Sequence, residues 1–465
     1  MPLLSDILRN KFEHDPTKSQ SELFLQLDNF ITCSEKRTTF ILKGYAGTGK
    51  TSVIATLVKV LPLFNYRFVL LAPTGRAAKV ISQYAHKSSF TIHKKIFKTK
   101  SSKNEIDSPI FSRAKNYATK TIFIVDEASM ISTIRENGQD LLTSLVDFVF
   151  EAADNKLLLV GDIAQLPPVF QQNSFALDRD YLVSKYHLFA KEALLTDITR
   201  QAEESGILYN ATMLRKSLAS NTLDIKLHTK DRKDIYRMNS SRLGDGLQYA
   251  YDKYGIENTI VICRSNKNAV MYNHFIRNQL MFKEEELEVG DVLLISRNNY
   301  TYSSDQIPSG FLANGDFIEV TKILNWEEIH GFRFADLMVR MVDVPQADNI
   351  YVKVILDTLH QYTPALSKED NQKLYESVLQ DYMDLNKKEQ ALAIKEDKYL
   401  NAVQVKYAYA LTCHKSQGGQ WDAVFVDQGY LPEDKIDSEF CRWLYTAITR
   451  SKSELFLVNF DQQFF

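Results

Sequence analysis

The sequence predicts an α/β protein built from two parallel-sheet units, with a small β-barrel inserted into the second unit. The first observation is a series of short β-branched and aromatic segments in the first half of the chain, each followed by a turn and a helical pattern. These segments are TTFILKG at 38–44, RFVLLA at 67–72, TIFIVD at 121–126 and KLLLVGD at 156–162. The alternation of strand and helix indicates a parallel sheet covered by helices.

The second observation is a similar set of segments after residue 200. They are NTIVIC at 258–263, VKYAYAL at 405–411, AVFVD at 423–427 and ELFLVN at 454–459. The third is a different texture over 285–360, where short strand patterns are separated by Asn, Gly and Asp turns, as in a small barrel. The charge-rich stretch 367–399 follows and opens with Ser367 and Asp370 as a capping box, so we expect one or two exposed helices there.

Length and charge are those of an ordinary globular chain. The 465 residues accommodate about three domains. Because 56 Lys and Arg residues balance 58 Asp and Glu residues, the net charge is only -2. A site for a polyanion must therefore come from local segregation of charge.

Cysteine usage and the chain start indicate the compartment. The four cysteines, at positions 33, 263, 413 and 441, are too dispersed for a CxxC pair and too few for a disulfide scaffold, which favours a reducing, intracellular environment. The first residues carry charges where a signal peptide needs an apolar core, and no stretch approaches the roughly 18 uninterrupted apolar residues of a membrane span. We expect a soluble cytoplasmic protein without a membrane partner.

A phosphate-binding loop is predicted directly after the first strand. The segment GYAGTGKT at 44–51 satisfies the pattern G-x-x-x-x-G-K-[ST] and precedes a helical pattern. Glycines let backbone N–H groups turn toward a β-phosphate, Lys50 adds a charge for the β- and γ-oxygens, and the Thr51 hydroxyl can bind Mg²⁺. The ATP-binding residues expected here are Gly44, Ala46, Gly47, Thr48, Gly49, Lys50, Thr51 and Ser52. A glycine-rich turn that matches by accident is the alternative.

Two carboxylates stand where the third strand ends. In a P-loop protein Asp126 would hold Mg²⁺ through its water shell, and Glu127 would orient or deprotonate the attacking water. The alternative is that both acids merely cap the following helix. Gln165 follows the fourth strand, where it could sense a γ-phosphate, although an isolated Gln is more often an ordinary loop amide.

Basic and aromatic residues gather between 76 and 120. This segment holds eleven Lys or Arg residues against Glu105 and Asp107. Phe90, Phe97, Phe111 and Tyr117 are interleaved with them, as in proteins that neutralise phosphates and stack bases. A solvated charged loop is the alternative.

Taken together, the motifs resemble those of superfamily 1 helicases, within their RecD-like and Dda-like branch. In family order they are GYAGTGKT at 44–51, LAPTGRAAKV at 71–80, TIH at 91–93, IVDEASM at 124–130, GDIAQLPPV at 161–169, LTDITRQ at 195–201, NGD at 314–316, YALTCHKSQGGQWD at 409–422 and LYTAITRSK at 444–452. The resemblance implies two RecA-like P-loop NTPase domains, a small basic insertion in the first and an SH3-like β-barrel insertion in the second.

The resemblance also implies roles for individual residues. Gln20 would contact adenine, Gly419 would belong to the ATP site, and Arg200 and Arg450 would reach the γ-phosphate, joining Lys50, Asp126, Glu127 and Gln165 in catalysis. Residues that would face the DNA strand are Pro73, Thr74, Lys79, His93, Asn314, Thr412, His414 and Lys415. Candidates for a strand-separating pin are Phe90, Phe97, Ile110 and Phe111. Thr412 and His414 could instead organise a turn, and Arg450 could be a helix C-terminal cation.

The implied organisation has four parts. They are a first RecA-like domain at 1–87 and 116–200, the basic insertion at 88–115, a second RecA-like domain at 201–284 and 401–465, and the barrel with a helical extension at 285–400. We expect a DNA helicase that uses ATP and Mg²⁺, moves 5′ to 3′ on single-stranded DNA, unwinds duplex DNA at junctions and acts as a monomer, with replication or recombination proteins as possible partners.

Other functions explain less of the sequence. A translocase or remodeller without productive unwinding, or a helicase acting on RNA, is the nearest alternative. A nucleic-acid binding module without catalysis would not need Lys50, Asp126 and Glu127. A small-molecule kinase would leave residues 405–452 unexplained.

Overall fold

The structure is a computed structural model of the chain. It describes residues 3–99, 111–135, 140–198, 204–220, 225–303, 307, 311–344, 347–432 and 436–465. The chain divides into two compact units, and each is described by itself. The first unit comprises Met1–Ile96, Arg113–Ser240 and Ser416–Phe465, and the second comprises Phe97–Ser112 and Ser241–Lys415.

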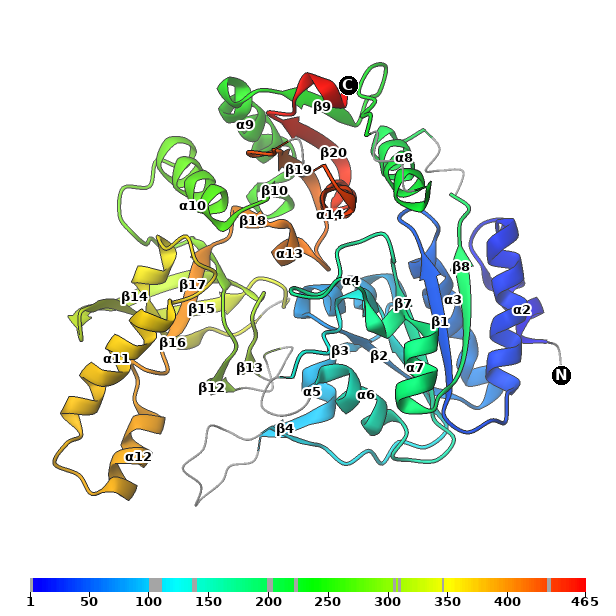
Figure 1. Cartoon of the computed structure of the whole chain (residues 1–465), viewed down its shortest axis with the longest axis horizontal. Helices are drawn as coiled ribbons and strands as arrows, with labels where there is room; N and C mark the ends of the chain where they lie inside the picture. The colour runs from blue at the N-terminus through cyan, green and yellow to red at the C-terminus, as the bar shows by residue number, and fades with distance from the viewer. Residues whose placement is uncertain are drawn as a thin grey trace. The chain divides into compact units, whose positions relative to one another are not determined.

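A six-stranded sheet is the centre of the first unit (Figure 1). In the order β3-β2-β6-β7-β1-β8, its strands are β3 (Ser89–Thr91), β2 (Arg67–Ala72), β6 (Thr121–Val125), β7 (Lys156–Gly161), β1 (Thr38–Gly44) and β8 (Phe189–Leu195). Every neighbouring pair is parallel. The carboxyl ends of β1, β6 and β7, where the sequence places its phosphate loop and carboxylates, therefore meet at one edge of the sheet.

Helices cover both faces of this sheet because alternate strand residues point to opposite faces. One face packs under α1 (Leu4–Lys11), α2 (Lys18–Thr32), α3 (Lys50–Val60) and α4 (Gly75–Ala85). Phe40, Ile124 and Leu158 belong to this core. On the other face Phe123 meets Phe148 of α6 (Leu141–Val149), with ring centroids 5.9 Å apart. The remaining helices here are α5 (Ile92–Ile96) and α7 (Arg179–Tyr186).

Each unit also contains a further set of parallel strands. Strands β9 (Ile235–Met238), β19 (Trp421–Asp427) and β20 (Ser451–Val458) belong to the first unit, together with α8 (Gly206–Ser220) and α14 (Ser438–Ile448). Strands β10 (Thr259–Cys263) and β18 (Ala410–Thr412) belong to the second unit, with α9 (Leu243–Tyr254) and α10 (Asn266–Phe275). Helix α13 (Cys413–Ser416) also starts in the second unit, which ends at Lys415.

A closed barrel forms the body of the second unit. Its strands are β11 (Val292–Ile295), β14 (Phe317–Ile329), β15 (Phe332–Met341), β16 (Ile350–Ile355) and β17 (Val403–Tyr407). A small pair, β12 (Asn299–Ser303) and β13 (Phe311–Leu312), accompanies it. The predicted fold class is confirmed: the protein is α/β with two parallel sheets and a barrel insertion.

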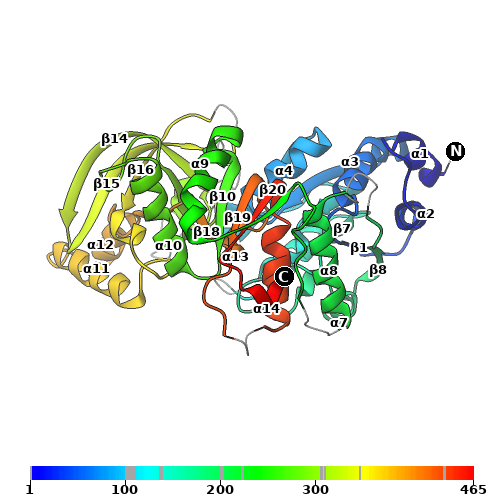
Figure 2. The ribbon, with the colours of Figure 1, turned by 90° about the horizontal axis from the view of Figure 1, so that it is seen from above.

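Two helices lie between the barrel strands β16 and β17, in the stretch where the sequence predicts one or two. They are α11 (Lys368–Asp381) and α12 (Lys387–Glu396), and both lie beside the barrel in Figures 1 and 2. Ser367 caps α11 by accepting the Asp370 N–H at 3.0 Å. Leu374 and Val378 of α11 pack with Phe334 of the barrel. Among the described residues, no helix combines the length and the apolar character needed to cross a membrane.

One strand prediction is wrong in detail. The sequence suggests a single strand over 405–411, but the structure has β17 in the barrel and β18 in the parallel sheet. The Asn273 side chain explains the break, because its Oδ1 accepts the N–H groups of Tyr409 and Ala410, each at 2.9 Å. The predicted basic insertion contains the paired strands β4 (Phe97–Thr99) and β5 (Phe111–Arg113). Its residues 100–110 lie outside the described part of the chain.

Candidate active site

The phosphate loop joins β1 to α3 in the first unit. Gly47 and Gly49 have φ angles of 75° and 80°, in the left-handed region that favours glycine. The Lys50 Nζ donates to the carbonyl oxygens of Gly44 and Tyr45, at 2.8 and 2.9 Å, so the side chain folds back along the loop. A β-carbon on Gly44 would lie 2.9 Å from the Lys50 Cγ. The loop is thus shaped to hold the lysine over its own backbone.

Gln20 is attached to this loop. Its side chain is 1% exposed, and its Nε2 donates to the Thr48 carbonyl at 3.0 Å. Its Oε1 accepts the Thr17 N–H at 2.9 Å and completes the capping box of α2. Gln20 therefore lies beside the predicted nucleotide site, while its contact with adenine stays a prediction. Thr51 and Ser52 lie in the first turn of α3, where the helix dipole favours an anion.

The two predicted carboxylates follow β6. The Asp126 Oδ1 accepts the Glu127 N–H at 2.9 Å, and Glu127 has a φ of 51°, a strained value for a residue with a side chain. Burial, and then the Glu127 carboxylate, raise the pKa of Asp126 to about 7, while the Lys50 charge acts in the opposite direction. Such a carboxylate is stabilised in its charged form by a nearby cation.

The oxygen atoms of Thr51 and Asp126 are of a chemical type that suits a magnesium ion. The Thr51 hydroxyl and the Asp126 carboxylate are oxygen ligands of the kind that Mg²⁺ uses together with water and phosphate oxygens. In the described residues no three His, Cys, Asp or Glu side chains gather as a metal cage. A site with one or two protein ligands is the usual arrangement for Mg²⁺ bound with a nucleotide.

The loop after β7 carries Gln165 to the same sheet edge. Gln165 is 6% exposed, and its Oε1 has no hydrogen-bond partner among the described residues. An unpartnered buried acceptor is costly unless a ligand or water satisfies it. The Asp162 carboxylate at the start of this loop accepts the Ala164 N–H at 2.9 Å.

Helix α14 contacts both the phosphate loop and the loop after β7, and these contacts were not predicted from the sequence. The Tyr445 hydroxyl donates to the Asp162 Oδ2 at 2.6 Å and accepts the Ala46 N–H of the phosphate loop at 2.9 Å. Burial, and then the Asp162 carboxylate, hold the pKa of Tyr445 well above its ordinary value, so the hydroxyl keeps its proton. Thr446 accepts the Leu166 N–H at 2.9 Å, and Arg442 donates to the Ile163 carbonyl.

The sequence does contain a pattern that indicates a polar face on α14. Residues 442 and 446 are polar and four positions apart within the mostly apolar α14, residue 450 follows the helix at the same interval, and residue 445 lies on the same face. Such a polar stripe on a buried helix indicates specific partners. The partners themselves, at positions 46 and 162–166, cannot be read from that spacing.

Arg450 is buried at the end of α14. Its side chain is 3% exposed, and its guanidinium donates to the carbonyl oxygens of Thr446 and Gly419 and to the Thr449 hydroxyl, at 3.0 to 3.3 Å. A β-carbon on Gly419 would lie 3.0 Å from the Arg76 Cδ, so Gly419 packs against α4. The other predicted arginine, Arg200, lies outside the described residues.

Three of the four predicted DNA contacts of the first unit lie just before or within α4, and the fourth, His93, lies in α5. Thr74 caps this helix, with its Oγ1 accepting the Ala77 N–H at 3.2 Å, and it follows the half-buried Pro73. Gly418 has a φ of 74°, and a β-carbon there would lie 3.0 Å from the Thr74 Oγ1. Lys79 is half-buried on α4. Burial lowers the pKa of His93 to about 4, so its imidazole is neutral at pH 7.

The predicted DNA contacts of the second unit also meet one another. The Lys415 Nζ of α13 donates to the Asn314 Oδ1 of the NGD turn, and burial lowers the pKa of Lys415 to about 8. Thr412 ends β18, and His414 lies in α13; both are half-buried. The NGD turn of the barrel region and the segment after β18 thus form one polar surface.

The pin candidates are only partly described. Phe90 lies in β3, and the Lys95 Nζ stands 5.4 Å from the centre of its ring. Phe97 begins β4 and is half-buried. Ile110 and the side chain of Phe111 lie outside the described part of the chain.

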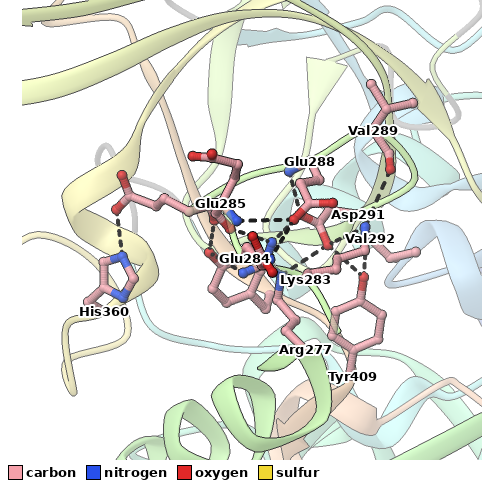
Figure 3. Close-up of polar contacts among 12 residues, drawn as sticks. Arg277, Lys283, Glu284, Glu285, Glu288, Val289, Asp291, Val292, His360 and Tyr409 are labelled. Carbon is pink, nitrogen blue, oxygen red and sulfur yellow. Dashed lines mark hydrogen bonds and ion pairs between the residues drawn. The ribbon is translucent and has the colours of Figure 1, made fainter. Parts of the chain in front are cut away.

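The second unit also contains a buried ionic cluster, which shares only Tyr409 with the predicted motifs (Figure 3). Asp291 is fully buried, and its carboxylate accepts from the Arg277 Nη2 at 2.8 Å, the Lys283 Nζ at 3.1 Å, the Tyr409 hydroxyl at 3.0 Å and the Glu288 N–H at 2.8 Å. Arg277 is 2% exposed and also donates to the Glu285 carbonyl at 3.0 Å. Each charge is satisfied within the cluster.

Two domain families match the chain. Residues 26–232 match the AAA domain, and residues 407–458 match the UvrD-like helicase C-terminal domain. The first match contains the phosphate loop, the carboxylates and Gln165. The second contains α13, α14 and Arg450.

Three relatives cover different shares of the chain. An uncharacterized protein of Acanthamoeba polyphaga mimivirus is 24% identical over 90% of this chain and 94% of its own length. A protein of Methanocaldococcus jannaschii is 25% identical over 96% of this chain but 38% of its own length. The ATP-dependent RecD2 DNA helicase of Deinococcus radiodurans is 28% identical over 37% of this chain and 21% of its own length.

Solved structures of Pif1 helicases are similar along most of the chain. Bacteroides Pif1 bound to ssDNA is 18% identical, covers 97% of this chain and 94% of its own, and has a TM-score of 0.49. The complex of Bacteroides Pif1 with ADP-AlF3 and ssDNA is 16% identical over the same shares, with a TM-score of 0.48. The two domain matches, an AAA domain followed by a UvrD-like helicase C-terminal domain, stand in the order and at the positions of the motifs that resemble those of superfamily 1 helicases.

Proposed function

We propose that this protein is an ATP-dependent DNA helicase that moves 5′ to 3′ along single-stranded DNA and separates the duplex ahead of it. The observation that carries the proposal is the Tyr445 hydroxyl, which joins the phosphate loop to the helix that precedes Arg450. A nucleotide-binding loop linked in this way to the helix that precedes an arginine provides the parts of an NTPase that couples hydrolysis to domain movement.

The nucleotide would bind over the phosphate loop. Its backbone N–H groups and Lys50 would hold the phosphates, and Thr51 and Asp126 would hold Mg²⁺, which supplies charge neutralisation when bound. Glu127 would accept the proton of the attacking water, and Gln165, whose buried Oε1 lacks a partner among the described residues, would orient that water.

Arg450 would act as an arginine finger only after changing partners. Its guanidinium now binds the carbonyls of Thr446 and Gly419, and stabilising a γ-phosphate would require releasing them. Arg200 would approach from the first domain. Closure of the ATP site would thereby be linked to movement of α14 and of the segment that starts at α13.

The nucleic acid would contact two surfaces. In the first unit these are the turn at Pro73 and Thr74 with Lys79 and His93, and in the second unit Thr412, His414, Lys415 and Asn314. The insertion at 88–115 would carry the pin. The name of the RecD2 relative supports DNA as the substrate, and the polarity rests on the motif resemblance.

Strand displacement tests the proposal directly. The full chain is given ATP and duplexes that carry only a 5′ tail, only a 3′ tail or no tail, with Lys50→Ala as the inactive control. We expect unwinding from the 5′ tail alone. Unwinding from the 3′ tail alone would contradict the polarity, and ATP-driven movement without strand separation would identify a translocase. The same duplexes with RNA tails test the choice of nucleic acid.

The pin has its own experiment. Shortening the insertion between 100 and 110 should abolish unwinding while nucleic-acid-stimulated ATP hydrolysis persists. Separating one base pair costs on the order of 1 to 2 kcal/mol, comparable to what an aromatic ring returns by stacking. Normal unwinding by the shortened chain would exclude a pin in this segment.

A further inference from the structure

Phe170 is the most exposed of the large apolar side chains in the described residues. It is 94% exposed and lies five residues after Gln165, on the loop that follows β7. Its neighbour Val169 is 49% exposed. A single exposed apolar residue is ordinary, but Phe170 combines exposure with a fixed and unfavourable backbone.

The backbone at Phe170 is left-handed, with a φ of 64°. The Gln171 N–H donates to the Pro168 carbonyl at 3.0 Å, which closes a turn with Val169 and Phe170 at its centre. Glycine adopts this conformation freely, whereas a residue with a β-carbon is strained in it. The turn therefore holds a phenyl ring in solvent at a position where glycine would be more stable.

The turn is anchored to the segment after Glu127. The Gln171 Nε2 donates to the Thr133 Oγ1 at 2.8 Å. Thr133 is followed by Ile134, which is 42% exposed, and by the exposed Arg135. We call Ile134, Arg135, Val169 and Phe170 the Phe170 patch.

The start of the same loop is hydrogen-bonded to residues near Arg450 and Lys415 in the sequence. The Leu166 N–H donates to the Thr446 Oγ1 at 2.9 Å, and the Leu166 carbonyl accepts from the Gln417 Nε2 at 2.8 Å. Gln417 is two residues after Lys415, a predicted DNA contact. The Phe170 ring thus lies on the loop that also carries Gln165. This loop is bonded to the motifs at 409–422 and 444–452, through Gln417 and Thr446.

We propose that Phe170 stacks on a base of the bound single strand, and that Arg135, two residues after the Thr133 to which the turn is bonded, contacts a backbone phosphate. The inference rests on the proposed function and adds a binding residue to it. A phenyl ring stacks on any base, which suits a protein that moves along arbitrary sequence. The patch offers one ring and two aliphatic side chains, whereas a stable protein interface buries about 1,000 Å² or more.

The test separates base stacking from phosphate binding. Fluorescence anisotropy measures the affinity of the full chain for a labelled oligo(dT) and for an abasic strand of equal length. Phe170→Ala should bind oligo(dT) about ten-fold more weakly than the wild type, the size expected for one lost stacking contact. The same variant should match the wild type on the abasic strand. Phe170→Trp should retain binding to oligo(dT).

Two further variants control for exposure and strain. Phe282 is 81% exposed and has a φ of 53°, but it lies in the second unit between α10 and the barrel. Phe282→Ala should bind both strands as the wild type does. Phe170→Gly removes the ring and the backbone strain together, so it should melt at a higher temperature and still lose affinity for oligo(dT).

The salt dependence gives an independent readout. Stacking involves no phosphate charge, so Phe170→Ala should lower the affinity for oligo(dT) without changing its slope against salt concentration, whereas Arg135→Ala should reduce the slope. Equal affinity of Phe170→Ala and the wild type for oligo(dT), or an equal loss on both strands, would overturn the inference and leave the proposed function intact. A wild-type chain that binds neither strand would overturn both.

Discussion

The predicted ATP site of the first unit and the ionic cluster of the second unit differ in what they leave unsatisfied. In the second unit, Arg277 donates hydrogen bonds to the Asp291 carboxylate and to the Glu285 carbonyl, while Asp291 also accepts from Lys283 and Tyr409 (Figure 3). In the first unit, the Gln165 Oε1 is left without a partner among the described residues, and burial raises the pKa of Asp126.

The difference separates structural charge from charge kept for a ligand. A buried ion pair with all its hydrogen bonds made has nothing left to bind, and its removal mainly changes stability. A cluster that retains an unpartnered acceptor and a carboxylate with a raised pKa is completed by a cation or by a polar ligand. We therefore expect substitutions in the ATP site of the first unit to alter catalysis. Substitutions in the ionic cluster of the second unit should alter folding stability.

The strongest test of this contrast is Lys50→Ala. The Lys50 Nζ is the charged group of the phosphate loop, and its loss should lower ATP turnover by about 10³ or more, because a preorganised charge in such a site is worth that much. Binding to single-stranded DNA should persist. The measurements are steady-state ATPase and fluorescence anisotropy. Turnover above a tenth of the wild-type value would contradict the assignment of the loop.

Asp291→Ala should act on stability instead. It leaves the buried Arg277 charge and the partly exposed Lys283 charge without their carboxylate, which costs about 3 to 5 kcal/mol of unfolding free energy. Chemical unfolding of the full chain measures this loss, and Glu369→Ala, an exposed acid on α11, is the matched control. If Asp291→Ala unfolded like the wild type but hydrolysed ATP poorly, the contrast between the clusters would fail.

Glu127→Gln should slow hydrolysis by roughly 10² while nucleotide affinity is kept. The amide has the shape of the carboxylate but cannot accept a proton, and a positioned base is worth about that factor. Single-turnover hydrolysis and equilibrium binding of a fluorescent ATP analogue separate the two effects. A loss of affinity with nearly normal turnover would indicate that Glu127 is a structural cap.

Tyr445→Phe should have the smallest effect of the four. Removing the hydroxyl leaves the Asp162 carboxylate and the Ala46 N–H without their partner, and a hydrogen bond to a charged group contributes about 1.5 to 3 kcal/mol. We expect DNA-stimulated kcat to fall by about ten-fold with little change in the KM for ATP. Tyr375→Phe, an exposed hydroxyl on α11, is the control. A raised KM with normal kcat would place Tyr445 in nucleotide binding instead.

Much of the fold and of the ATP site could be predicted because the relevant signals are local. The strand, the glycine turn and the helix of the phosphate loop are contiguous in 38–60, and the strand before Asp126 is equally continuous. The barrel was predicted from turn residues within 285–360. Prediction failed at 405–411, where a side chain from α10 takes the backbone N–H groups of Tyr409 and Ala410 and divides one β pattern between two sheets.

The sequence by itself determined the α/β class, the barrel insertion, the phosphate loop and the acids that follow β6, since each depends on neighbours within a few residues. Only the tertiary structure decided that the Tyr445 hydroxyl meets the Ala46 N–H, 399 positions away, and that Asp291 is satisfied while Gln165 is not. It also decided that Phe170 faces solvent. The physical reason is that hydrogen-bond partners and exposure depend on which surfaces pack together, and residue spacing does not encode that packing.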